Sequence, residues 1–368
     1  MSFFEQDFDK KSVSGIPTFL LANHFWIKAY YENQMGKFAL PGNDVNSRIE
    51  AAYQSAYDDF QCTFGMGIHS GDNPLYTKLG NKAWCEIKKN VYVRKSITIM
   101  ERTEYPALIR EPLQYLYSTC LQRLYTRKLN TQVFIESLEF IDKLLSDENK
   151  IFTNLTLSGR MHFNMLIIES PLDFLADFLR GTKELLLDLH SVPELVKEAC
   201  LVLNNLILDQ AEMHRKTYNT NHLLLPLHLP GLLNRRDFEE FYYPTYNALV
   251  ETLIRKGYNI MILFEGNVDR FIDIIATTDS SQVIAHFEST SIEEYQAYFR
   301  GKSTYISGFY PTYLLKDGTE RECLDAAQKL KDITAGNDRF IFSTNKVLFT
   351  HEDASYQNLK NVYDFFRL

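Results

Sequence analysis

The stretch NIMILFEGNVDRFIDIIATTDSSQVIAHFE, residues 259–288, decides the fold class. It begins and ends with short runs rich in β-branched and aromatic residues, 259–264 and 282–287, and a helix-length segment lies between them. Two buried strands joined by a helical crossover are typical of parallel pairing, since a tight turn cannot connect parallel strands. The stretch therefore predicts an α/β protein with a parallel sheet.

The same alternation repeats from about residue 150 onward. Helix starts lie between the β-rich runs, with predicted capping boxes at Ser291 and at Thr319–Glu322. Strands are predicted at residues 155–157, 222–227, 259–264, 282–287, 304–307 and 339–343. In a chain of 368 residues, this run predicts a (βα)8 TIM barrel formed by one domain, residues 1–368.

The first 95 residues are predicted to form an N-terminal helical extension and flap that caps the barrel, with helices near 19–31 and 46–60. A doubly wound open sheet is the alternative architecture. The sequence has neither G-x-G-x-x-G after a strand nor G-x-x-x-x-G-K-[ST], so it lacks the usual motifs of that alternative.

Composition excludes several classes of protein. The chain has 47 acidic against 39 basic residues and no basic stretch, which argues against nucleic-acid binding. Five cysteines without a C-x-x-C pair indicate reduced thiols and exclude a cysteine-built zinc ribbon. The sequence begins without a signal-peptide pattern and holds no apolar window long enough to span a membrane, so we expect a cytoplasmic protein.

Polar side chains follow the predicted strands where barrel enzymes place their reactive groups. Glu265 follows the strand at 259–264, while His286 and Glu288 share one face of the next strand. If all three point inward, they suit Zn²⁺ with an open position, or general acid–base chemistry without metal. Alternatively, both glutamates cap helices and His286 is a hydrogen-bonded core residue.

Two further groups are open to more than one interpretation. His228 either lines the pocket or satisfies a backbone group at a strand end. Asp177 and Arg180 have the i,i+3 spacing of a helical ion pair, with Asp173 on the same face. An ordinary ion pair without a role in catalysis is the more common explanation of such spacing.

A set of short motifs at these positions resembles a known superfamily. The motifs, in order, are Asp177–Gly181, Leu229–Gly231, Phe238–Tyr246, Phe264–Asn267, His286–Glu288, Gly308–Thr312, Leu315–Thr319 and Asn358–Lys360. Their order and spacing over roughly residues 95–368 resemble the uroporphyrinogen decarboxylase superfamily, and within it the corrinoid-dependent methyltransferase branch. The resemblance implies a (βα)8 barrel.

The superfamily offers three activities, and the sequence departs from two of them. The N-terminal segment lacks the arginine cluster that binds porphyrinogen carboxylates, so decarboxylation is disfavoured. The thiol-methylating enzymes hold zinc through His-x-Cys-Gly-Asn and a late cysteine. This chain has Leu263 and Glu265 at the first place and Ser343–Lys346 at the second, so that ligand set is absent.

The chain resembles best the methyltransferase components of O-demethylases. The resemblance implies zinc ligation by Glu265 and His286. Position at the strand ends favours Glu288 or His228 as the third ligand. Substrate contacts are expected from His228, Asn267, Tyr310 and Asn345. Without metal, a protonated Glu265 or Glu288 would donate the proton instead.

The expected reaction moves a methyl group between a small substrate, such as a methoxylated aromatic, and the cobalt of a corrinoid carried by a partner protein. Three alternatives stay open: a methylcorrinoid:tetrahydrofolate-type methyltransferase, a uroporphyrinogen-decarboxylase-like lyase, and a non-catalytic descendant that binds a ligand or the corrinoid protein. A homodimer is also among the expected assemblies.

Overall fold

The computed structural model describes residues 15–22, 26–27, 45–60, 62–66, 78–88, 91–157, 161–350 and 352–368. The apolar runs at the centre of the sequence form its central strands, and every residue of the runs predicted at 222–227 and 259–264 is buried. These strands lie in an eight-stranded sheet in the order β1-β2-β5-β6-β7-β8-β9-β10. All neighbouring pairs are parallel, which confirms the predicted α/β class.

The strands of this sheet are β1 (Leu20–Leu21), β2 (Cys62–Met66), β5 (Met161–Ile167), β6 (His222–Leu227), β7 (Asn259–Phe264), β8 (Val283–Phe287), β9 (Tyr305–Gly308) and β10 (Phe340–Ile341). The chain around β1 also bonds to the chain around β10. The Phe19 N–H donates to the Phe342 carbonyl at 3.1 Å, and the Phe342 N–H donates to the Pro17 carbonyl at 2.8 Å. The chain beside β1, the first strand in the sheet order, is therefore hydrogen-bonded to the chain beside β10, the last strand.

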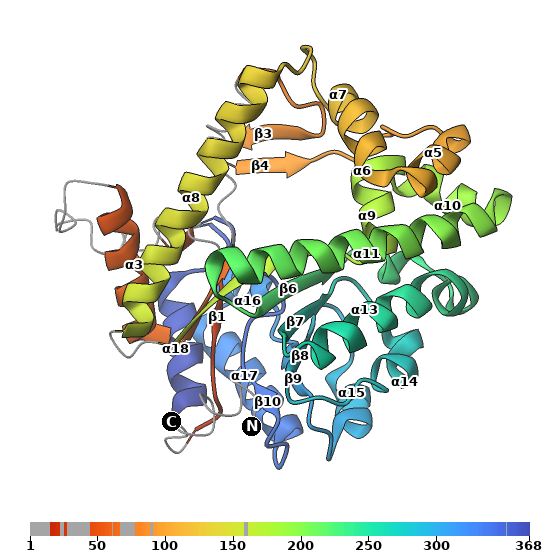
Figure 1. Cartoon of the computed structure of the whole chain (residues 1–368). Coiled ribbons are helices and arrows are strands. Elements are labelled where there is room, and N and C mark those ends of the chain that lie inside the picture. The colour runs from red at the N-terminus through yellow and green to blue at the C-terminus, as the bar shows by residue number, and fades with distance from the viewer. Residues whose placement is uncertain are drawn as a thin grey trace.

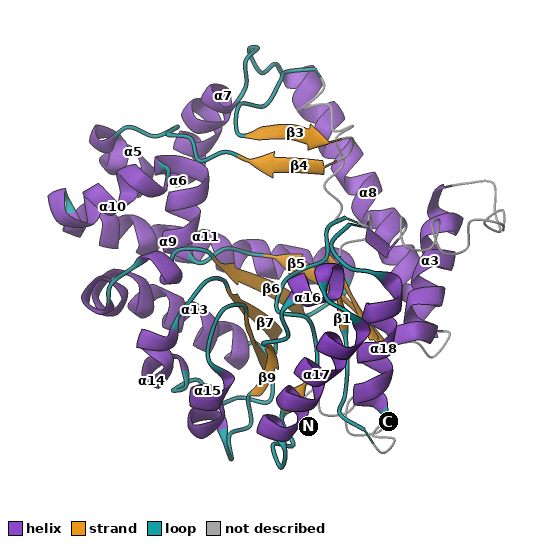
Figure 2. Ribbon diagram, turned by 180° about the vertical axis from the view of Figure 1, so that it is seen from behind, coloured by secondary structure: helices purple, strands orange, loops and turns teal. Residues whose placement is uncertain are grey.

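Helices surround the strands (Figure 2). Those of the C-terminal part are α9 (Pro171–Phe174), α10 (Thr182–Ser191), α11 (Pro193–Tyr218), α12 (Arg235–Asp237), α13 (Tyr243–Arg255), α14 (Ile272–Ile275), α15 (Ile292–Phe299), α16 (Thr312–Asp317), α17 (Glu320–Thr334) and α18 (Tyr356–Arg367). Those before them are α3 (Val45–Phe60), α5 (Tyr105–Arg110), α6 (Pro112–Tyr115), α7 (Leu121–Leu124) and α8 (Thr131–Leu157). The antiparallel hairpin β3 (Trp84–Lys88) and β4 (Val91–Arg94) lies apart from the sheet, between α7 and α8 (Figure 1).

The strands bury apolar side chains on both faces. One set packs against the helices, and the other forms an enclosed cluster on the opposite face. The enclosed cluster consists of Phe19, Leu21, Met165, Leu224, Met261, Leu263, Ile284, Tyr305 and Ile341. Alternate residues of one strand belong to different clusters, as the two-residue period of a strand requires.

Several local predictions were wrong. Residues 155–157 end helix α8, because Ile151 and Leu155 continue one buried helical face; the strand of this region is β5. β1 and β2 place part of the predicted N-terminal extension in the sheet, and β1 replaces the start of the helix expected near 19–31. β1 is too short to show alternation in the sequence.

Other local predictions hold. The helix expected at 46–60 is confirmed as α3. Thr319 and Glu322 form the predicted capping box at the start of α17, whereas Ser291 makes no capping hydrogen bond to α15. Among the described residues, no helix combines the length and apolar character needed to cross a membrane.

Candidate functional site

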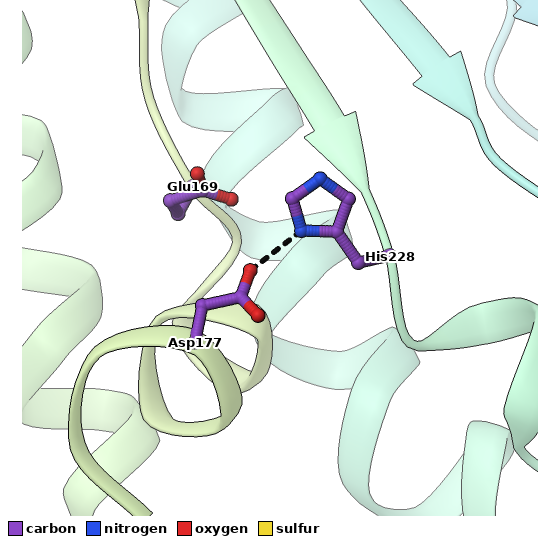
Figure 3. A group of neighbouring side chains, drawn as sticks. All are labelled: Glu169, Asp177 and His228. Atoms are coloured by element: carbon purple, nitrogen blue, oxygen red, sulfur yellow. Dashed lines mark hydrogen bonds and ion pairs between the residues drawn. The ribbon is translucent and has the colours of Figure 1, made fainter. Parts of the chain in front are cut away.

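Four polar side chains gather where β5, β6 and β7 end. Glu169 follows β5, His228 follows β6 directly, and Glu265 follows β7 directly, while Asp177 comes from the π-helical segment after α9. His228 Nδ1 lies 2.5 Å from Asp177 Oδ2, and His228 Nε2 lies 3.5 Å from Glu265 Oε1. Glu169, Asp177 and His228 each place one ligand atom within 4.8 Å of the others (Figure 3).

The local sequence explains the position of Asp177. Ser170 caps α9 by accepting the Asp173 N–H at 3.3 Å, and Pro171 occupies the first helical position. The chain then widens into the π-helical segment η3 (Leu175–Arg180), which contains Asp177. π-helical turns are frequent at functional sites because they re-aim side chains that an α-helix would direct elsewhere.

A buried carboxylate holds the backbone of His228 in place. Asp173 has no exposed surface, and its Oδ1 accepts the N–H groups of Leu229 at 2.8 Å and His228 at 3.2 Å. Its Oδ2 accepts the hydroxyls of Tyr242 at 2.5 Å and Ser170 at 2.8 Å. Burial raises the pKa of Asp173 to about 6, although the charge of His228 and these hydrogen bonds oppose the shift.

The carboxylates also control the charge of His228. Burial lowers the pKa of His228, but the hydrogen bonds to Asp177 and Glu265 and the charges of Glu265 and Asp173 outweigh this effect and raise it to about 12. Without a metal, the ring is therefore an imidazolium at neutral pH, with one N–H directed at Asp177. Such a group is a fixed positive charge rather than a proton shuttle.

The donor set fits a zinc ion. Carboxylate oxygens and an imidazole nitrogen are the ligands that Zn²⁺ accepts in catalytic sites. A carboxylate on the other ring nitrogen is the usual means of orienting a ligating histidine, and Asp177 or Glu265 takes this role according to which nitrogen binds the ion. Zinc would replace the ring proton, because only the neutral imidazole binds metal.

The three residues predicted as metal ligands have different partners in the structure. Glu265 lies beside His228. Glu288 forms an ion pair with Lys346, and its Oε2 accepts the Gly266 N–H at 2.7 Å. His286 is only 2% exposed, and its Nε2 lies 3.2 Å from the Asn345 carbonyl oxygen.

Glu265, His286 and Glu288 are therefore not the ligand group that the described residues bring together, since Lys346 neutralises Glu288 and His286 lies deeper in the fold. Burial lowers the pKa of His286 to about 4, which keeps this ring neutral.

The predicted substrate contacts also have local roles. Tyr310 has no exposed surface and donates its hydroxyl to the Cys323 carbonyl at 2.9 Å, which places it in the core. Asn267 is exposed and bonds through both side-chain atoms to Asp269. Asn345 donates to the Glu288 carbonyl at 2.8 Å and accepts from Thr312, so it ties strand ends together.

Sequence reasoning missed Glu169 altogether and assigned Asp177 to the wrong partner. Arg180 does not pair with Asp177; its Nε donates to Asp188 at 2.6 Å, and Arg102 donates to the same carboxylate at 2.6 Å. Correct placement of β5 would have identified Glu169 as a strand-end residue. The position of Asp177 depends on the π-helical turn, which the sequence pattern did not indicate.

Comparison with known proteins gives a likeness of fold. No protein-family model and no curated protein matches the chain. A methyltransferase from Methanosarcina mazei has a similar structure, with a TM-score of 0.60 over 97% of this chain and 95% of its own, at 9% sequence identity. At that identity the likeness shows the fold alone, so the chain shares the α/β architecture of this methyltransferase over nearly its whole length.

Proposed function

We propose that the protein is a methyltransferase of a corrinoid-dependent system. It moves a methyl group between a small substrate, such as a methoxylated aromatic, and the cobalt of a corrinoid carried by a partner protein. The full-length likeness of fold supports methyl transfer, and so does the cluster of His228, Asp177, Glu169 and Glu265 at the carboxyl ends of the strands. The motif resemblance supports the corrinoid partner.

This proposal includes a closed (βα)8 barrel. The hydrogen bonds that link Phe19 and Leu21 to Phe342 and Leu348 support closure between β1 and β10. In such barrels the reactive groups lie at the carboxyl ends of the strands. His228 and Glu265 occupy this position on two adjacent strands.

His228 between its carboxylates is the observation that best supports this chemistry. Methyl transfer from an ether leaves negative charge on the departing oxygen, which the protein must stabilise. A zinc ion held by His228, Asp177 and Glu169, with Glu265 beside it, would supply Lewis-acid polarisation of that oxygen. The chain contributes orientation: Asp173 holds the backbone at residue 228, and Glu265 faces the ring nitrogen that does not bind the ion.

Zinc analysis of purified protein tests the ligand set. We expect stoichiometric zinc in the wild type, and loss of zinc in His228→Asn and Asp177→Asn. Glu288→Gln is the matched control, since Glu288 is a strand-end carboxylate already paired with Lys346. Full zinc content in the His228→Asn variant would contradict the proposed ligands. A loss of zinc confined to the Glu288→Gln variant would also contradict them.

A cobalamin assay tests the reaction. The protein is mixed with cob(I)alamin and a panel of methoxylated benzoates, and formation of methylcobalamin is followed by visible absorbance. Methylcobalamin with tetrahydrofolate tests the opposite direction of transfer. If neither mixture turns over with the corrinoid free or bound to a carrier protein, the proposed activity is wrong and a ligand-binding role takes its place.

A further inference from the structure

Three buried polar atoms inside the sheet lack hydrogen-bond partners. They are His286 Nδ1, Ser307 Oγ and Ser343 Oγ, and no described residue bonds to any of them. The residues are 2%, 0% and 0% exposed. Nearly all buried polar side chains in proteins have a partner, so three such atoms on β8, β9 and the segment just after β10 require an explanation.

The strand pattern places the three residues on one face of the sheet. Ile284, Tyr305 and Ile341 belong to the enclosed apolar cluster, and His286, Ser307 and Ser343 each come two residues later on the same chain segment. Since residues two apart share a face, all three point toward the same enclosed side of the sheet.

The register places Ser343 two residues further along the sheet than Ser307, because Ser307 pairs with Ile341. His286 pairs directly with Ser307 across β8 and β9, and the ring of Phe19, a member of the enclosed cluster, lies 6.2 Å from the ring of His286. His286 also pairs with Leu263, which is two residues before Glu265. His286 and Ser307 are therefore about 7 Å deeper in the sheet than Glu265 and His228, at roughly 3.3 Å per residue, whereas Ser343 is level with Glu265 in the register.

The available donors and acceptors define what can bind. The Asn345 carbonyl can only accept, so the His286 Nε2 that faces it carries the hydrogen and Nδ1 presents a lone pair. Each serine hydroxyl both donates and accepts. A group that gives one hydrogen to Nδ1 and accepts from the serines satisfies these atoms, and a hydroxyl oxygen does both.

We propose that His286, Ser307 and Ser343 form a binding site for one uncharged hydroxyl oxygen, either of an ordered water or of a hydroxyl-bearing ligand. The site lies on β8, β9 and the segment after β10, and is separate from the carboxylate and imidazole cluster at the ends of β5, β6 and β7. His286 thus recognises a neutral polar group instead of holding a metal ion. This inference does not depend on methyl transfer.

Replacement of the serines by alanine tests the site. A hydroxyl that binds a ligand stabilises the fold, whereas removal of an orphaned buried hydroxyl is neutral or stabilising. We expect Ser307→Ala and Ser343→Ala each to lower Tm by about 2 °C, and the double variant to lower it by less than the sum, because both bind one group. Ser137→Ala, which removes a buried hydroxyl bonded to the Val133 carbonyl within α8, is the control for loss of a satisfied hydroxyl.

A ligand comparison distinguishes the two sources of the oxygen. If the group is water, the serine variants lose stability without any additive, and a crystal structure of the protein at about 1.8 Å shows an oxygen within hydrogen-bond distance of the three atoms. If the group belongs to a ligand, phenol raises Tm more than toluene does in the wild type, and both serine variants abolish that difference. Unchanged or higher Tm in both variants, together with equal effects of phenol and toluene, would overturn the site.

Discussion

The Nδ1 atom of His228 lies 2.5 Å from the carboxylate of Asp177, a residue 51 positions earlier in the chain. The pair joins the end of β6 to the π-helical segment η3. Because Glu265 faces the other ring nitrogen, the imidazole has a carboxylate on each side. This arrangement makes the protonation of His228 the most testable electrostatic property of the site.

Stability of the metal-free protein should depend on this proton. The pKa of His228 is raised to about 12 in the folded chain, above its value of about 6.5 in an unfolded one. The resulting stabilisation is complete below pH 6.5 and is lost as the pH rises toward 12. We expect the free energy of unfolding, measured with urea after chelation of metal, to fall between pH 7 and pH 10.

The His228→Asn variant is the control for that measurement. It should show a flatter pH profile over the same range, since asparagine has no proton to lose. More than a third of the His228 side chain is exposed, so solvent screening keeps the slope below the limiting value of about 1.4 kcal/mol per pH unit. Identical profiles for the variant and the wild type would show that His228 is not the titrating group.

Replacement of Asp173 by alanine should disturb both stability and the site. The change leaves four buried or half-buried donors without their acceptor: two backbone N–H groups at 228–229 and the hydroxyls of Tyr242 and Ser170. We expect a loss of about 3–5 kcal/mol in urea unfolding and weaker zinc binding. Asp173→Asn keeps one of the two acceptor oxygens and should lose less; an equal loss in both variants would mean that the hydrogen bonds are not the cause.

Asp188→Ala should destabilise the fold without affecting the site. Asp188 is fully buried and bonds to the Arg180 guanidinium, whose side chain is 3% exposed, so its removal leaves a buried charge uncompensated. The expected loss is about 3–5 kcal/mol in urea unfolding at neutral pH. Arg236→Ala, at a side chain that is 87% exposed, should change stability by less than about 0.5 kcal/mol. Zinc content should be unchanged in both folded variants.

Gly308 should be intolerant of any side chain. Its φ is +92°, and a Cβ atom there would lie 2.3 Å from the Phe287 carbonyl oxygen, which belongs to the neighbouring strand. Gly301 has a similar φ of +77° but no atom within 4 Å of the added Cβ. Gly301→Ala should therefore lower the free energy of unfolding only by the cost of a left-handed backbone conformation, about 1–2 kcal/mol. Gly308→Ala should lower it clearly more, as measured by thermal unfolding. Equal losses would mean that contact with Phe287 is not limiting.

The sequence predicted the elements whose local pattern is strong. Residues 223–227 and 260–264 are continuous apolar runs, as is typical of strands buried on both faces, and the strands that contain them have the predicted bounds, 222–227 and 259–264. Thr319 and Glu322 form the predicted cap because capping depends on residues only three apart. β1 contains two residues, and so short a strand is defined by its hydrogen-bonded neighbours rather than by its own pattern.

The sequence by itself determined the α/β class and the position of Glu265 and His228 at strand ends, because burial, alternation and strand length are local properties of the chain. Only the tertiary structure decided which of these polar groups meet. Asp177 and Arg180 have helical spacing, yet a π-helical turn directs one toward His228 while the other binds Asp188. The partner of a side chain depends on the distances between elements remote in sequence, and these distances are set only when the sheet and its helices pack.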